Sequence, residues 1–126
     1  MNLMTAQEKQ RLLALLDRQQ RWCQSAEAQD DAGDPVTFDD GRATAWDLTG
    51  AMCLLFGWKR ACELFTQLAQ HISGGPLEID SLAALQDYND DEQTTYEGVV
   101  AQLRSMPVSR GDPHYEDDLT GTAQQR

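Results

Sequence analysis

Hydrophobic residues recur every three or four positions near the start of the chain, which is the spacing of one face of an amphipathic helix. Within residues 5–22 this face is formed by Leu12, Leu15, Leu16 and Trp22. Thr5 and Glu8 have the spacing of a capping box, in which each side chain satisfies a backbone N–H of the other residue. The pattern therefore predicts a first helix over residues 5–22.

The same periodicity predicts two longer helices in the middle of the chain, over residues 42–56 and 58–72. Asp39 and Asp40 are candidate N-caps for the first of them. Its second half is apolar on every side, which is typical of a central, buried helix. Gly57 is a natural break between the two.

Two shorter helices are predicted after a Ser-Gly-Gly-Pro turn. The first covers residues 82–88, with Asp80 or Ser81 positioned as its N-cap. The second covers residues 96–106 and begins after Thr94, which has the capping-box spacing to a glutamate three residues later. Together the five segments predict an all-α fold, a compact bundle of about five helices around the buried central helix.

Residues 25–38 interrupt the helical pattern with turn-forming residues and a short β-favouring run. A small β-hairpin and an irregular loop both fit this segment. Residues 1–106 are expected to form a single helical domain. Residues 107–126 have few large apolar side chains and many Gly, Pro, Asp and Gln, which predicts a flexible acidic tail.

The charge of the chain narrows the classes of partner. Among 126 residues there are 10 Lys and Arg against 21 Asp and Glu, a formal net charge of −11. Such a protein repels phosphate backbones unless it carries a concentrated basic face, and the sequence has none, so nucleic-acid binding is not expected. The acids gather in two blocks, residues 30–47 with six acids and one Arg, and residues 80–97 with six acids and no base.

The cysteine and histidine content argues against a structural metal or a disulfide framework. No C-x-x-C pair is present, and His71 and His114 lie far in sequence from any cysteine. Buried, inert thiols are expected at Cys23, Cys53 and Cys62. The N-terminus lacks a secretory pattern and residues 50–58 are too short an apolar run to span a bilayer, so we expect a cytoplasmic protein without membrane contact.

One acidic segment begins like a calcium loop, because Asp87, Asn89 and Asp91 occupy its first, third and fifth positions. Glu92 stands at the sixth position, which requires Gly, and Gly98 stands at the twelfth, which requires a carboxylate. We therefore expect an acidic turn between helices, and no metal or cofactor. The polar residues of this turn remain candidates for binding: Asp87, Asn89, Asp90 and Asp91.

The three tryptophans are a second group of candidates, because each lies at the apolar edge of a predicted helix. Trp22, Trp46 and Trp58 can act as large lids of the core, or they can line a pocket for a small ligand. Asp39, Asp40 and Asp47 near Arg42 offer carboxylates for acid–base chemistry without an organised partner. No catalytic constellation is recognisable, so a non-catalytic role is expected.

Two stretches carry a resemblance to a known family. The first contains Trp22-Cys23-Gln24, Ala28, Gly33, Val36 and Thr49-Gly50-Ala51, and the second contains Tyr88-Asn89-Asp90 and the segment from Tyr96 to Leu103. They resemble a family of small bacterial and phage proteins that carries only a domain-of-unknown-function label. Ser25, Asp47 and Tyr88 stand where the family pattern has Gly, Cys and Trp. The resemblance implies a common fold and no activity.

Three functions remain compatible with these features. The first is a protein-binding module without catalysis, whose acidic blocks meet a basic partner. The second is an acidic mimic of nucleic acid that occupies a DNA-binding protein, which requires the two acidic blocks to form one continuous ridge. The third is a small-ligand binder with a pocket between the central helix and the tryptophans. We expect the first.

Overall fold

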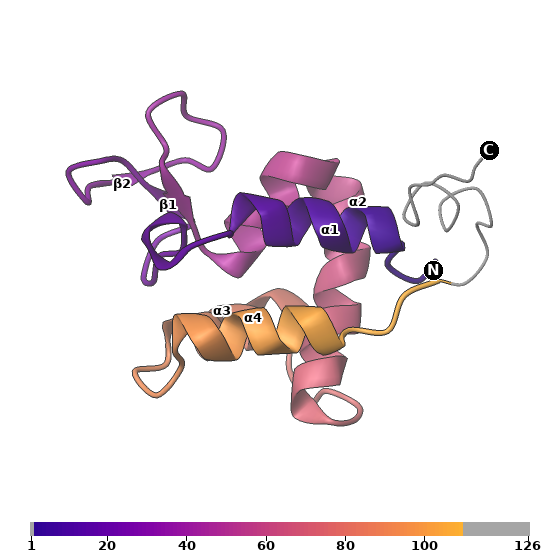
Figure 1. Ribbon diagram of the computed structural model, residues 1–126. Helices are drawn as coiled ribbons and strands as arrows, with labels where there is room; N and C mark the ends of the chain where they lie inside the picture. Colours follow the sequence, from indigo (N-terminus) through magenta and orange to yellow (C-terminus); the bar gives the residue numbers. More distant parts are fainter. Residues whose placement is uncertain (1, 110–126) are drawn as a thin grey trace, which may run out of the picture.

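Four α-helices and a small three-stranded antiparallel sheet make up residues 2–109, the part of the chain that this computed structural model describes (Figure 1). The helices are α1 (Ala6–Leu15), α2 (Leu48–Ser73), α3 (Ser81–Asp90) and α4 (Tyr96–Ser105). The strands are β1 (Ala28–Gln29), β2 (Pro35–Val36) and β3 (Ala45–Trp46), and a single 3-10 turn, η1, covers Gln19–Arg21. The predicted all-α class is therefore wrong in its details, since the fold is mostly helical with a sheet, and the helices number four instead of five.

Helix α1 begins as predicted and ends earlier. The Thr5 hydroxyl accepts a hydrogen bond from the Glu8 N–H at 3.0 Å, and the Glu8 carboxylate accepts one from the Thr5 N–H at 2.9 Å, so the capping box is confirmed. The helix stops at Leu15 instead of residue 22, because side chains from elsewhere satisfy its last carbonyls. Arg21 Nε donates to the Leu15 carbonyl, and the Tyr96 hydroxyl donates to the Leu16 carbonyl.

Of the two interpretations of residues 25–38, hairpin or irregular loop, the structure has the hairpin, which belongs to a larger sheet. The strand order is β2-β1-β3, with Ala28 paired to Val36 on one side and to Trp46 on the other. The connection between β1 and β2 is organised by Asp30, whose carboxylate accepts hydrogen bonds from the backbone N–H groups of Ala32 and Asp34. Gly33 in this turn has a φ of +84°, which favours glycine.

Strand β3 displaces the start of the central helix. Residues 45 and 46 pair with β1, so α2 begins at Leu48 and its N-cap is Asp47, not the predicted Asp39 or Asp40. The predicted break between residues 42–56 and 58–72 is confirmed at Gly57, whose backbone is not helical (φ 79°, ψ 161°). Helix α2 runs across this kink and ends at Ser73. Glycine adopts this conformation without steric cost.

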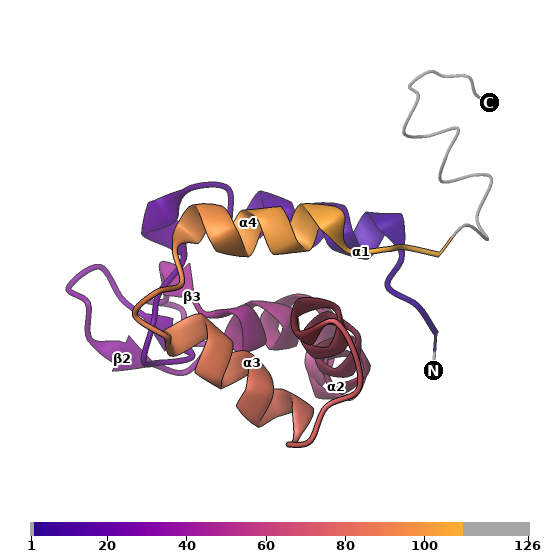
Figure 2. The ribbon, with the colours of Figure 1, turned by 90° about the horizontal axis from the view of Figure 1, so that it is seen from below.

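Helix α2 is the predicted central, buried helix. Its buried residues come from both sides of the kink and include Leu48, Ala51, Met52, Ala61, Leu64 and Leu68. In Figure 2, α1 and α4 form one layer and α2 and α3 form a second, with the sheet at one end of the molecule. No helix within residues 2–109 combines the length and apolar character that crossing a bilayer requires.

The last two helices have the predicted type with shifted boundaries. Asp80 is the N-cap of α3, with its carboxylate accepting from the Ala83 N–H. Thr95, not Thr94, is the N-cap of α4, since its hydroxyl accepts from the Gly98 N–H at 3.0 Å. Most of the predicted flexible tail over residues 107–126, including His114, lies outside the described residues.

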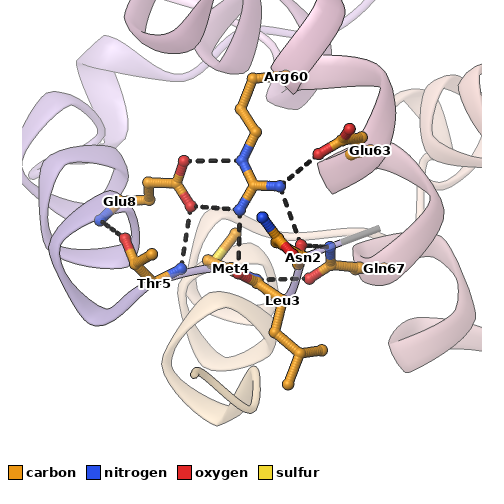
Figure 3. A network of polar contacts seen from close by, with 8 residues as sticks. All are labelled: Asn2, Leu3, Met4, Thr5, Glu8, Arg60, Glu63 and Gln67. Carbon is orange, nitrogen blue, oxygen red and sulfur yellow. Dashed lines mark hydrogen bonds and ion pairs between the residues drawn. The ribbon is translucent and has the colours of Figure 1, made fainter. Parts of the chain in front are cut away.

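An arginine of α2 holds the N-terminal segment against the helix (Figure 3). All five N–H donors of Arg60 are used, two on the Glu8 carboxylate, one on Glu63 and two on the backbone carbonyls of Asn2 and Leu3. Burial of the neighbouring Met4 is complete. The planar guanidinium group matches this fan of acceptors, whereas a lysine ammonium has only three donors from one atom.

Replacing Arg60 by lysine is expected to lower the free energy of unfolding by about 2 kcal/mol, because at least two of these acceptors lose their charged donor. Urea denaturation followed by circular dichroism measures the change. Arg42→Lys is the matched control, since Arg42 pairs with Asp40 on the surface and makes no contact that joins two elements. Equal stabilities of the Arg60 and Arg42 variants would show that the five hydrogen bonds of the Arg60 guanidinium do not add to the free energy of unfolding.

Candidate functional site

A cavity of about 660 Å³ beside the sheet end of α3 receives side chains from both acidic blocks of the sequence, one from the first and three from the second. The cavity is lined by Ser25, Ala26, Glu27, Asp47, Gln86, Asp87, Asp90 and Asp91. Five of these eight residues carry carboxylates and none is basic. Asp47 comes from the first acidic block and three of the aspartates from the second, although 40 positions separate the nearest of them in sequence. The tertiary structure therefore concentrates negative charge in one concave place.

A buried asparagine positions the segments that surround this cavity. Asn89 has no exposed surface, and its amide makes four hydrogen bonds. Its oxygen accepts from Trp22 Nε1 at 2.8 Å and from the Leu48 N–H at 3.1 Å. Its nitrogen donates to the Cys23 carbonyl at 3.0 Å and to the Asp90 carboxylate at 2.9 Å. An amide has two donors and two acceptor sites, so the whole capacity of Asn89 is used to join α3, the Trp22 loop and the start of α2.

The loop after Trp22 is fastened to the end of α3 by further hydrogen bonds. The Ser25 N–H donates to the Asp90 carboxylate at 2.8 Å, and Gln24 Nε2 donates to the backbone carbonyls of Asn89 and Asp91. Ser25 has a φ of +68°, the left-handed conformation that favours glycine. The family resemblance places a glycine at position 25, and glycine adopts this backbone conformation without steric cost.

Asp47 is the buried member of the acidic group, with 3% of its surface exposed. One carboxylate oxygen, Oδ1, accepts from the Gly50 N–H at 2.6 Å and from the Thr49 hydroxyl at 2.9 Å. No described residue donates a hydrogen bond to the other oxygen. Burial raises the pKa of Asp47 to about 6, and the nearby charges of Asp90 and Glu27 add to the increase. Asp47 therefore lines the cavity as a carboxylate with an unused acceptor atom and an unfavourable charge.

The raised pKa of Asp47 makes a testable contribution to stability. Since the folded state binds the proton more tightly than the unfolded chain, whose aspartate pKa is near 3.8, this residue makes the protein less stable as the pH rises from about 4 to about 6. We expect Asp47→Asn to remove this loss, about 3 kcal/mol at pH 7, because Asn keeps the cap acceptor without the charge. Urea denaturation of both proteins at pH 4, 5, 6 and 7 measures the difference.

Asp40→Asn is the control for this pH series. Its hydrogen bonds with Arg42 lower the pKa of Asp40 to about 2, so its titration lies below the pH window of the experiment. The Asp40 variant should therefore follow the wild-type pH profile between pH 4 and pH 7. A constant difference between wild type and the Asp47 variant over the same range would mean that Asp47 titrates normally in the folded protein.

The three candidate tryptophans do not come together in one pocket. Trp46 is buried in β3 with its ring nitrogen donating to the Phe38 carbonyl at 2.9 Å, and Trp22 is half-buried and donates to Asn89. Trp22 and Trp46 therefore cover the edge of the core, and the ring nitrogen of each donates a hydrogen bond within the fold. Trp58 is different, because 60% of its surface is exposed and it lines a separate cavity of about 120 Å³.

The predicted acidic turn is shorter than expected, because α3 continues to Asp90 and only Asp91 of the four candidate residues lies beyond the helix. Asn89 is turned into the core, while Asp87, Asp90 and Asp91 line the acidic cavity. Within residues 2–109, no three His, Cys, Asp or Glu side chains are placed so that they could hold a metal ion. The sequence did not identify four of the lining residues, and it offered Asp47 as a carboxylate for acid–base chemistry only. The four are Ser25, Ala26, Glu27 and Gln86. The contact between residues 25–27 and α3 has no signal in sequence spacing.

The cysteines are free thiols, two of them buried. Burial raises the pKa of Cys23 to about 12 and that of Cys53 to about 11. Both thiols are therefore protonated at neutral pH and are poor nucleophiles. Cys62 is only partly buried.

The fold and the cavity together define a small, mostly helical protein with an acidic cleft between its central helix, its sheet and α3. The chain belongs to a family of unknown function, DUF6197, whose model matches residues 5–106. The family membership predicted from the sequence is thus confirmed. The matched range includes every residue that lines the acidic cavity. Comparisons with curated proteins and with solved structures find no match.

Proposed function

We propose that this protein is a non-catalytic, cytoplasmic protein-binding module, and that its acidic cavity receives a lysine or arginine side chain of a partner protein. The observation that supports the proposal is the cavity itself, which five acidic residues line without a basic residue among them. Hydrogen bonds between a charged donor and a carboxylate are among the strongest that proteins make.

Asp47 favours the binding of a cation in the acidic cavity. Its second oxygen has no donor among the described residues, and burial makes its charge unfavourable. A cation placed beside it supplies both a donor and an opposite charge, and so lowers the pKa of the carboxylate. Binding should therefore release a proton near pH 6 and become tighter as the pH rises from 5 to 7.

The alternative functions fit this geometry less well. A mimic of nucleic acid has to present its negative charges along an outward ridge that a protein groove can enclose. Here Asp47 of the first block and three aspartates of the second line a concave site, which suits an inserted side chain. A small-ligand pocket lined by tryptophans lacks support, because Trp22 and Trp46 use their ring nitrogens inside the fold.

A titration with an acetylated tetralysine peptide, followed by amide chemical shifts, tests the proposal. We expect the shifts to concentrate at the residues that line the acidic cavity. The double variant Asp87→Asn/Asp91→Asn should bind about tenfold more weakly, since each partly exposed ion pair contributes about 0.7 kcal/mol. Both side chains are exposed, and asparagine keeps the acceptor that Asp91 offers to the Gln93 N–H.

The matched control removes the same charge elsewhere. Glu78 and Glu92 are exposed and do not line the cavity. The variant Glu78→Gln/Glu92→Gln removes the same two negative charges as the cavity variant. This variant should keep nearly all of the affinity. Equal weakening of both double variants, or shifts spread evenly over the surface, would mean that the peptide responds to net charge alone and would refute the proposed site.

A further inference from the structure

A second cavity adjoins the acidic one. Its volume is about 120 Å³, and its walls include the apolar side chains of Phe38, Trp58, Phe65 and Leu82. Glu27 and Gln86 line both cavities, so the two share a wall. The acidic cavity, called the acidic chamber below, and this smaller cavity, called the apolar chamber, therefore lie side by side between the sheet, α2 and α3.

Trp58 leaves a large apolar surface uncovered beside this second cavity. It follows directly after Gly57, where the backbone of α2 changes direction, and 60% of its surface is exposed, against 7% for Trp46. Its ring meets Phe65 edge to face, with the ring centroids 6.0 Å apart at an interplanar angle of 73°. Exposed aromatic surface at the rim of a pocket is a common anchor of protein contacts.

The size of the apolar chamber limits what can enter it. A cavity of about 150 Å³ holds a benzene molecule when its walls are apolar. This cavity of about 120 Å³ also has Glu27, Thr49 and Gln86 in its walls, and its volume suits one aliphatic side chain of medium size that packs against the four apolar side chains. Because Glu27 and Gln86 line both cavities, two side chains that enter them come from nearby positions of one segment. In an extended peptide, residues two positions apart point to the same side and are separated by about 6.5 Å along the chain.

We infer that the two chambers together bind one short segment of the partner, in which a lysine or arginine and a leucine-sized aliphatic residue stand two positions apart. The basic side chain enters the acidic chamber, and the aliphatic side chain packs in the apolar chamber against Trp58. The inference rests on the proposed function and adds the sequence chemistry of the segment. Charge complementarity fixes which residue enters which chamber.

Two peptides test this inference. One carries a leucine two positions after a lysine in an otherwise lysine-rich sequence, and the other has alanine in place of that leucine. Wild-type protein should bind the leucine peptide about tenfold more tightly than the alanine peptide, because the leucine buries additional apolar surface. The emission of Trp58 should change only with the leucine peptide.

Variants of exposed apolar residues separate the two chambers. Trp58→Ala should abolish the advantage of the leucine peptide and leave the affinity for the alanine peptide unchanged, and Trp58→Phe should restore part of the advantage. Ile79→Ala is the control, since Ile79 is similarly exposed at 54% and lines neither chamber. Amide shifts of each variant establish that it is folded.

The outcomes distinguish this inference from the proposed function. If the alanine peptide binds at the acidic cavity and leucine adds nothing, or if the advantage of leucine persists in Trp58→Ala, the inference is wrong and the proposed function stands. If neither peptide shifts the residues of the acidic cavity, both are wrong.

Discussion

Replacing Asn89 by leucine is expected to lower the free energy of unfolding by about 4 kcal/mol. The side chain is fully buried, and leucine has a similar size without any polar atom. Its four partners are the Trp22 ring nitrogen, the Leu48 N–H, the Cys23 carbonyl and the Asp90 carboxylate. Each buried group that loses its partner costs about 1–3 kcal/mol.

Two further variants make the Asn89 result specific. Gln86→Leu changes an exposed amide one turn earlier on α3 and should alter the stability by less than about 0.5 kcal/mol. Asn89→Asp keeps the acceptor for Trp22 and Leu48 but places a carboxylate beside that of Asp90, so this variant should regain stability as the pH falls and the acid becomes protonated. Urea denaturation measures all three. Equal stability of the Asn89→Leu and Gln86→Leu variants would contradict the anchoring role.

Gly50→Ala is expected to be comparably damaging, at about 3 kcal/mol or more, for a steric reason. A Cβ atom at this position would lie 2.1 Å from the Glu27 carbonyl oxygen and 3.0 Å from the Glu27 carbonyl carbon. These are backbone atoms, and the same oxygen accepts the Asp47 N–H at 3.1 Å, so neither side can move without breaking the junction between the sheet and α2. The close approach requires glycine.

Gly41→Ala is the control for this substitution. Nothing lies within 4 Å of a Cβ at Gly41, so this alanine should leave the melting temperature nearly unchanged. In an open helix, alanine stabilises by about 1 kcal/mol relative to glycine. A stabilised Gly50→Ala protein would therefore show that the loop at Glu27 moves away easily, and that the wall between the two chambers is flexible.

Both substitutions act on the structure that forms the cavity. Asn89 joins α3 to the start of α2, and Gly50 allows residue 27 to approach that start closely. Glu27 and Asp47, which line the acidic chamber, are held by these contacts. The binding experiments therefore use substitutions at the exposed positions Asp87 and Asp91, which leave this junction intact.

Several elements could be predicted from local patterns. The Thr5–Glu8 capping box, the Asp80 cap, the hairpin within residues 25–38 and the break at Gly57 all depend on residues a few positions apart. Their hydrogen bonds and turns form within one segment, so spacing is sufficient evidence for them. The burial of the central helix also follows from its apolar composition on every side.

The features that were missed depend on contacts between distant segments. Strand β3 is two residues long and has no periodicity, and it exists because β1 pairs with it. That pairing delays α2 to Leu48 and makes Asp47 its N-cap. Helix α1 ends early because Tyr96, 80 positions away, donates a hydrogen bond to the Leu16 carbonyl.

The candidate site also combines features that local sequence predicts with features that only contacts between distant segments create. Composition and charge were sufficient to identify two acidic blocks and the candidate residues Asp87, Asn89, Asp90 and Asp91. Only the tertiary structure shows that Asn89 points inward, where its amide donates a hydrogen bond to the Cys23 carbonyl 66 positions away. It also places Asp47 in the same cavity as the aspartates near the end of α3. Sequence spacing encodes the order within a helix or turn, whereas the convergence of separate segments is decided by which surfaces the core buries against one another.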